Sequence, residues 1–270
     1  MASATHTGLL QLWPSAGGDP ITLEKPNGAP AQGGGLQQTS LVLAWSPNGK
    51  LLAFSTHGQT SIRLWDPTNT RVPAKTLEGH ESPLRSVSWS RDGARLASAA
   101  DNGTIKVWDV NTGKVISDFT YFVRQNAGNG MAKPRASSTL SLSPDGKQLA
   151  VYGEDEKTII LDVDARTELK TLLGRPSNRD IHDVVCAVAW SPDGKRLATT
   201  SPDGTFLLRD TATWQEVLVL PPVLADPFHV HADRPGLGGS LEWSPDGRQL
   251  AFFSGSGSVT IWDGTWEAEK

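Results

Sequence analysis

Residues 189–199 read AWSPDGKRLAT and residues 206–210 read FLLRD, and this two-part signature decides the fold because it recurs along the chain. Variants of the first part occur at residues 44–54, 88–98, 141–151, 189–199 and 242–252, and the second part ends at Asp66, Asp109, Asp162, Asp210 and Asp263. From Trp45 to Trp65 is 20 positions, and the equivalent distance in the other four copies is 19. Such constant spacing indicates one supersecondary unit copied in tandem.

Each unit has the pattern of a meander of short strands. The runs on either side of Asp-Gly or Asn-Gly alternate apolar and polar residues, and this dipeptide between two such runs is a strong hairpin signal. A second turn, such as residues 101–104 (DNGT), leads into the strand that carries Trp-Asp, and a fourth segment, such as residues 75–77 (KTL), completes the sheet. One sheet of this size cannot bury both faces, so the copies must stack on each other.

These residues carry a resemblance to a known family. Gly79-His80, the Ser-Pro-Asp-Gly turns, the Leu-Ala-Ser runs and the Trp-Asp endings resemble the WD-repeat (WD40) β-propeller family over about residues 8–264. The resemblance implies radial four-stranded blades around a channel. In that family a buried set of His, Ser or Thr, Asp and Trp ties each blade together; here Asn102 stands at the Asp position beside His80 and Trp108, and Leu161 and Arg209 replace Trp. The uniform turns are more similar to bacterial-type members.

We therefore predict an all-β propeller forming a single domain over residues 1–270. Five complete repeats are expected to begin near residues 41, 85, 138, 186 and 239, after a partial N-terminal blade at residues 8–25. This gives about six blades, and the alternatives of a six-bladed protein and a fragment of a seven-bladed ring stay open. The segment before residue 8 offers no first or second strand by its pattern, so the first blade is expected to start at its third strand.

Most of the ten tryptophans are explained by the repeat. Seven of them occupy the first or third strand of a complete repeat and are expected to pack between blades, and Trp13 holds the third-strand position in the partial N-terminal blade. Trp214 and Trp266 lie outside the repeat positions, which makes them candidates for surface contacts. The single cysteine, Cys186, lies among valines and alanines and is expected to be a buried, inert thiol.

Composition and the N-terminal sequence limit the expected cellular location and the expected classes of partner. No basic start with an apolar run of signal-peptide length occurs, and no apolar run is long enough to span a bilayer, so a cytoplasmic location and no membrane partner are expected. The formal net charge of −4 and a pI near 5.9 argue against nucleic acid as a partner. Self-association through unclosed blade edges is a further expectation.

The candidate binding residues lie in the connections between blades, at residues 26–40, 120–136, 174–183 and 221–239. In a propeller these connections emerge on one face, and long loops on a rigid scaffold are frequent binding sites. The residues expected to contact a partner are Arg124, Lys133, Arg135, Arg175, Arg179, Arg234, His229 and His231. The alternative is that these segments are only solvated connectors.

One cluster could hold a metal ion. Asp226, His229, His231 and Asp233 lie within ten residues, and alternate residues of an extended segment point to the same side. The further ligands of a metallohydrolase are absent, and a blade-capping role like that of His80 is the simpler interpretation of His231, so neither a metal nor another cofactor is predicted. Phosphate-binding loops, nucleophile elbows and paired catalytic cysteines are also absent, and the protein is predicted not to be an enzyme.

Two function classes remain open. The favoured one is a non-catalytic scaffold that binds a protein or peptide on the loop face, as the family resemblance implies. Its partner is expected to be an acidic or phosphorylated segment, because arginine forms bidentate hydrogen bonds with carboxylates and phosphates. The alternative is a propeller attached to or gating a hydrolase, since these repeats also resemble those of prolyl-oligopeptidase and Tol-type propellers. Both interpretations rest on analogy at the level of the fold.

Overall fold

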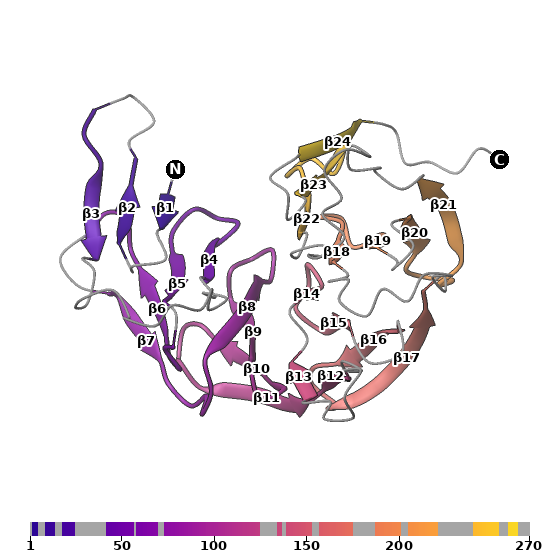
Figure 1. The fold of residues 1–270 in the computed structure, drawn as a ribbon, viewed down its shortest axis with the longest axis horizontal. Helices are drawn as coiled ribbons and strands as arrows, with labels where there is room; N and C mark the ends of the chain where they lie inside the picture. Colours follow the sequence, from indigo (N-terminus) through magenta and orange to yellow (C-terminus); the bar gives the residue numbers. More distant parts are fainter. Residues whose placement is uncertain are drawn as a thin grey trace, which may run out of the picture.

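The computed structural model describes residues 2–4, 9–13, 18–24, 42–56, 58–69, 73–124, 134–136, 139–152, 157–174, 187–200, 205–220, 240–253 and 259–263. Every regular element in these residues is a β-strand, and the strands form a six-bladed β-propeller of small antiparallel sheets. This confirms the predicted fold class. The chain passes from blade to blade in sequence order, and the blades radiate from a common centre (Figure 1).

The strands of each blade follow one another along the chain. Blade 1 comprises β1 (Ala2–Ala4), β2 (Leu10–Leu12) and β3 (Ile21–Glu24); blade 2 comprises β4 (Val42–Trp45), β5 (Leu52–Ser55), β6 (Ile62–Trp65) and β7 (Lys75–Leu77); blade 3 comprises β8 (Leu84–Trp89), β9 (Arg95–Ala100), β10 (Thr104–Asp109) and β11 (Val115–Thr120). After a separate hairpin, β12 (Phe122–Arg124) and β13 (Pro134–Ala136), blade 4 comprises β14 (Leu140–Leu142), β15 (Gln148–Tyr152), β16 (Lys157–Asp162) and β17 (Thr167–Leu173). Blade 5 comprises β18 (Val188–Trp190), β19 (Arg196–Thr200), β20 (Phe206–Asp210) and β21 (Glu216–Leu220), and blade 6 comprises β22 (Ser240–Trp243), β23 (Gln249–Phe253) and β24 (Val259–Asp263).

The first two strands of blades 2 to 6 are joined by the turn that the sequence repeats. In blade 4, the Ser143 hydroxyl donates to Asp145 Oδ1 (2.6 Å) and accepts from the Gln148 amide (2.9 Å), while the Gly146 amide donates to the Ser143 carbonyl (2.8 Å). Gly146 has φ 70°, in the left-handed region where glycine avoids the strain of a side chain. The equivalent bonds recur in the other four turns, so the repeated Ser-x-Asx-Gly sequence has a local structural cause.

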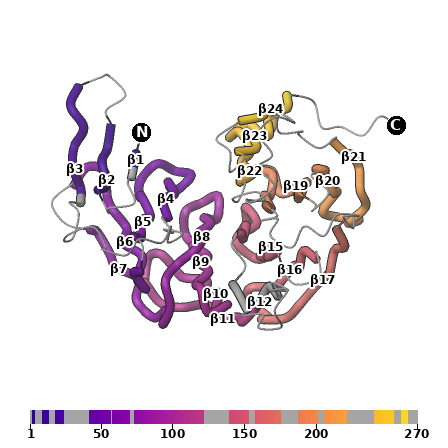
Figure 2. The backbone as a smooth tube through the Cα atoms, viewed as in Figure 1, coloured from indigo at the N-terminus to yellow at the C-terminus, as the bar shows by residue number. Residues whose placement is uncertain are grey.

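Apolar packing joins consecutive blades. Five core clusters each combine one face of a blade with the facing side of the next, from the pair of blades 1 and 2 to the pair of blades 5 and 6. In the part of the chain that the structure describes, no apolar cluster joins blade 6 to blade 1. The blades therefore form an open arc, and its first and last blades stand apart on opposite sides of the opening (Figure 2).

The N-terminal blade differs from the expectation. Ala2–Ala4 forms β1 and pairs with β2, with Ser3 opposite Gln11, so a second strand precedes the predicted third strand. Its sequence, ASA, carries no alternating pattern, and for this reason the strand was not recognisable. In blade 6, the region where a fourth strand was expected, residues 264–270, lies outside the described residues.

Candidate interaction surfaces

The two faces of the propeller follow from the antiparallel order of its strands. Turns from the first to the second strand and from the third to the fourth strand lie at one end of each blade, and all other connections lie at the opposite end. We call the first end the turn face and the second the loop face. The predicted binding segments all belong to the loop face.

Most of the predicted binding residues lie outside the described residues, namely Lys133, Arg175, Arg179, Arg234, His229 and His231. The same holds for the candidate metal cluster at residues 226–233, for Cys186 and for Trp266. Among the residues that the structure does describe, no group of three or more His, Cys, Asp or Glu side chains has the geometry of a metal site.

The remaining two arginines lie in a hairpin that the sequence did not predict. β12 and β13 pair between blades 3 and 4, with Arg135 opposite Val123 and Arg124 opposite Pro134. The two arginines are therefore one register position apart on adjacent strands rather than a direct cross-strand pair. Two of the predicted binding residues therefore lie on a two-stranded hairpin in the connection between blades 3 and 4.

On the turn face, the acidic side chains are bound within their own turns. Asp92 Oδ1 accepts hydrogen bonds from the Ser90 hydroxyl (2.6 Å) and from the Ala94 amide (2.9 Å). The hydrogen bond from Ser90 and then that from the Ala94 backbone hold the pKa of Asp92 below its ordinary value. Asp246 has the same arrangement with Ser244 and the Arg248 amide, and its pKa is lowered for the same reasons. These carboxylates stay charged and serve as turn anchors.

Adjacent turns are also bonded to each other. Asn48 Nδ2 donates to the Asp92 carbonyl (3.2 Å), and the Arg91 amide donates to the Pro144 carbonyl (3.0 Å). The Arg91 side chain reaches further, because its Nη1 donates to the Pro192 carbonyl (2.6 Å) across blade 4. The turn face is therefore a continuous polar rim over blades 2 to 5.

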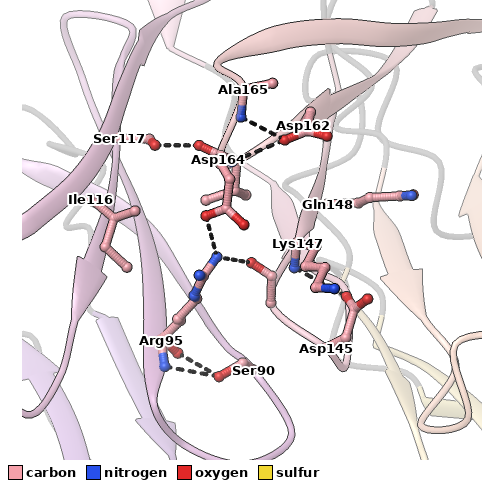
Figure 3. A network of polar contacts seen from close by, with 12 residues as sticks. Ser90, Arg95, Ile116, Ser117, Asp145, Lys147, Gln148, Asp162, Asp164 and Ala165 are labelled. Carbon is pink, nitrogen blue, oxygen red and sulfur yellow. Dashed lines mark hydrogen bonds and ion pairs between the residues drawn. The ribbon is translucent and has the colours of Figure 1, made fainter.

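The link between blades 3 and 4 is the most extended of these contacts. Arg95 Nη1 donates to the Gly146 carbonyl and to Asp164 Oδ1, each at 2.9 Å (Figure 3). Nearby, the Ser117 hydroxyl donates to the Val163 carbonyl, and Arg166 Nη2 donates to the Ile116 carbonyl (2.8 Å). The cationic side chains of Arg95 and Arg166 in this network bond from blade to blade.

A buried polar network lies inside blade 3, as the family resemblance implied. Trp108 Nε1 donates to the Ser98 hydroxyl (2.8 Å), His80 Nε2 lies 2.7 Å from the same hydroxyl, and His80 Nδ1 lies 3.1 Å from the Thr104 hydroxyl. Thr104 in turn donates to Asn102 Oδ1 (2.7 Å), so Asn102 completes the network at the position expected for Asp. Burial, with a smaller contribution from Lys106, lowers the pKa of His80 to about 4. The ring is therefore neutral at physiological pH.

Blade 5 uses a different residue for the same contact. Arg209 occupies the position of Trp108, and its Nη1 donates to the Thr199 hydroxyl (3.1 Å), which is the equivalent of Ser98. Its Nη2 donates to the Leu173 carbonyl of blade 4 (2.7 Å) and to Glu216 (3.0 Å). This buried cation therefore makes two hydrogen bonds within blade 5 and one to blade 4.

Trp214, a candidate for surface contacts in the sequence, is partly buried in the structure. Its ring packs edge-on against Trp190, with centroids 5.9 Å apart, and it joins the apolar cluster between blades 4 and 5. Its backbone has φ 61°, at the turn between β20 and β21. The local turn geometry, which the repeat pattern does not reveal, directs this aromatic side chain onto a neighbouring strand.

The geometry defines a class of protein: a repeat protein whose β-propeller blades are tied by polar turns and, in blade 3, by a His–Ser–Trp network. Residues 38–66, 71–109 and 175–210 match the family model of the WD domain, G-beta repeat. Over these three segments the chain is similar to the repeat of that family.

Known proteins with similar sequences include a WD repeat-containing protein. The chain is 32% identical to nuclear distribution protein PAC1 of Arthroderma otae over 60% of this chain and 36% of that protein. It is 25% identical to WD repeat-containing protein 1 of Mus musculus over 83% of this chain and 33% of that protein. The chain thus spans about a third of the length of these relatives. They are eukaryotic, so the expectation of a bacterial-type member has no support from them.

Solved structures show the same fold at low sequence identity. The β-propeller domain of Cps50 (Swd1) from Myceliophteria thermophila superposes with a TM-score of 0.62 at 18% identity, covering 84% of this chain and 66% of that one. A chain of the mitotic checkpoint complex superposes with a TM-score of 0.66 at 19% identity, covering 98% of this chain and 75% of that one. In the described part of our chain, no helix has the length and hydropathy needed to cross a membrane.

Proposed function

We propose that the protein is a non-catalytic scaffold that binds a protein segment on its loop face. WD40 propeller proteins generally act as protein-interaction scaffolds, and the relatives and structures described above include members of protein assemblies by their names. None of these matches supplies support for a propeller attached to a hydrolase.

The choice of face rests on the contrast between the two ends of the blades. On the turn face, the turn acids and the cations Arg91, Arg95 and Arg166 are engaged in bonds within or between blades. On the loop face, the connections differ in length, and the one between blades 3 and 4 projects the β12–β13 hairpin with Arg124 and Arg135. This contrast is the observation that carries the proposal, because variable loops on a rigid frame are where proteins place binding residues.

The partner that we propose is an acidic or phosphorylated segment. Arg124, Arg135, Arg175 and Arg179 come from two connections that flank blade 4, and a planar guanidinium group recognises carboxylate or phosphate with paired hydrogen bonds. Single exposed ion pairs contribute little to affinity, so several arginines would have to act together. We also propose that the protein acts in the cytoplasm and without a cofactor.

The experiment compares two quadruple variants by binding to arrays of acidic and phosphorylated peptides. The first variant carries Arg124→Ala, Arg135→Ala, Arg175→Ala and Arg179→Ala. The control carries Lys50→Ala, Lys147→Ala, Lys195→Ala and Arg248→Ala, which removes the same charge from exposed positions on the turn face. We expect the first variant to lose binding by about tenfold or more and the control to retain it. Equal losses would indicate an effect of net charge alone, and undiminished binding by the first variant would overturn the proposed site.

A further inference from the structure

The two end blades of the arc expose side chains whose counterparts are buried in the other blades. On the third strand, the residues one and three positions before the Trp position face the next blade. In blades 1 to 5 these residues are all buried: Leu10 and Leu12, Ile62 and Leu64, Ile105 and Val107, Thr158 and Ile160, and Phe206 and Leu208. In blade 6 the same positions are held by Val259 and Ile261, which are 52% and 59% exposed. Blade 6 therefore presents an apolar surface of the type that a following blade covers.

Blade 1 exposes the opposite half of the same kind of interface. The Trp position of the third strand faces the preceding blade, and Trp65, Trp108, Leu161 and Arg209 are buried there. Trp13 holds this position in blade 1 and is 42% exposed, although its Nε1 donates to the Ser3 hydroxyl (2.7 Å) as Trp108 donates to Ser98. The Trp13 side of blade 1 thus has the same local structure as the Trp side of the other blades, but among the described residues no preceding blade packs against it.

The interface between blades 5 and 6 shows how such surfaces fit together. Phe206, the counterpart of Val259, packs on Trp262, the counterpart of Trp13, with ring centroids 4.4 Å apart. The same pair of positions meets between blades 2 and 3, where Ile62 and Leu64 share a cluster with Trp108. The Val259–Ile261 surface and the Trp13 surface are therefore the two complementary sides of an interface that the molecule already forms within itself.

We propose that the Val259–Ile261 surface of blade 6 is a docking site for the Trp13 surface of blade 1 in a second copy of this chain. Within one chain the first and last blades lie on opposite sides of the opening of the arc (Figure 1), and among the described residues no apolar cluster joins them. Both surfaces are exposed as they stand, so the blade 6 surface of one copy can meet the blade 1 surface of another. Because the contact joins unlike surfaces, it is heterologous, and each copy keeps one unused surface for a further copy.

The test is sedimentation velocity on the full chain and on two single variants. The wild type is expected to show a mass that rises with concentration. Ile261→Asp removes the blade 6 surface, and Trp13→Asp removes the blade 1 surface, so each variant alone is expected to associate at least about tenfold more weakly, because a charge is placed in an apolar contact. Leu169→Asp on β17 makes the same kind of change at a similarly exposed position outside both surfaces and should associate as the wild type does.

The decisive sample is an equal mixture of the two single variants. Each variant keeps the surface that the other lacks, so the mixture should form a one-to-one dimer that grows no further, since the two altered surfaces both carry an acid and cannot pair. Circular dichroism and melting of each variant verify that the blades remain folded. A wild type that stays monomeric at all concentrations, a folded Trp13→Asp variant that associates as strongly as the wild type, or a mixture that stays monomeric although both variants are folded would each overturn the proposal.

Discussion

Trp108 and Trp13 hold the same position of the repeat and make the same indole-to-serine hydrogen bond, but Trp108 is 1% exposed and Trp13 is 42% exposed. We expect Trp108→Ala to lower the free energy of unfolding by about 3–5 kcal/mol, through lost burial and a residual cavity. Trp13→Ala should cost less than about half of that, because much of its ring already contacts water. Denaturant unfolding at low protein concentration measures both, and equal losses would contradict these burial roles.

His80 makes the stability of blade 3 sensitive to pH. Its pKa in the folded protein is about 4, against 6.5 in the unfolded chain, so between these values the unfolded state takes up a proton that the folded state does not bind. Stability should therefore fall as the pH decreases from about 6.5 to 4, by about 3 kcal/mol in total. Below that range, His80 contributes no further change.

The control for this pH dependence is His80→Gln, which removes the titrating ring from the same position. Its free energy of unfolding should be lower at pH 7 and should decrease less between pH 6.5 and 4 than that of the wild type. Parallel pH profiles for the two proteins would show that the decrease has another origin.

At the scale of the single turn, alanine substitutions at Gly146 and Gly194 distinguish the cost of backbone strain from the cost of crowding around the added Cβ. Both have positive φ, 70° and 73°, so alanine at either site should cost about 1–2 kcal/mol through the left-handed backbone. At Gly194 the nearest atoms to an added Cβ belong to Pro144 at 3.7 Å, which is an ordinary contact. At Gly146 the added Cβ would lie 2.8 Å from Arg95 Cδ and would displace the side chain that bonds Asp164.

Gly146→Ala should therefore lower the free energy of unfolding by about 1–3 kcal/mol more than Gly194→Ala does, and thermal unfolding should give it the lower melting temperature. Arg95→Ala removes the closest of these contacts and leaves Ser90 Cβ at 3.3 Å, so Gly146→Ala should cost less in an Arg95→Ala background than in the wild type. Indistinguishable melting temperatures for the two glycine variants would refute the role assigned to Arg95.

The elements show which parts of the structure a repeat pattern can predict. The strands of blades 2 to 5 were predictable because alternating runs and Ser-x-Asx-Gly turns determine them locally. β1 and the β12–β13 hairpin were not, because short strands such as Ala2–Ala4 acquire their pairing from neighbours rather than from their own pattern. The contact of Trp214 with Trp190 was not predictable either, since it depends on a turn with positive φ.

The candidate binding surface was less predictable than the fold. The sequence identified cationic residues in the connections, but whether several of them converge depends on the paths of loops that no repeat constrains. The exposed surfaces at Trp13 and at Val259 and Ile261 were invisible to the pattern, because the pattern assigns these residues to buried positions. Only the three-dimensional arrangement reveals that these side chains are exposed to this extent.

At the scale of the whole molecule, the arc behaves as a linear array in which each blade is stabilised by its neighbours. β23 and β9 are both second strands with a paired strand on each side, but blade 6 has one apolar interface and blade 3 has two. We expect the amides of β23 to exchange with solvent at least about tenfold faster than those of β9, measured by hydrogen exchange at a concentration where the protein is monomeric. Uniform protection across the blades would indicate a single cooperative unit.

The Arg91 side chain adds a constraint of another kind to this array. Contacts between adjacent blades fix the angle between each pair of neighbouring blades separately. Small variations in these angles add up along the row of blades. The bond from Arg91 to the Pro192 carbonyl spans blades 3 and 5 and skips the blade between them, so it limits the sum of two successive angles. A ligand that changed the angles between blades 3, 4 and 5 would have to break this hydrogen bond first. Binding at these blades should therefore favour partners whose shape already matches the curvature of the arc.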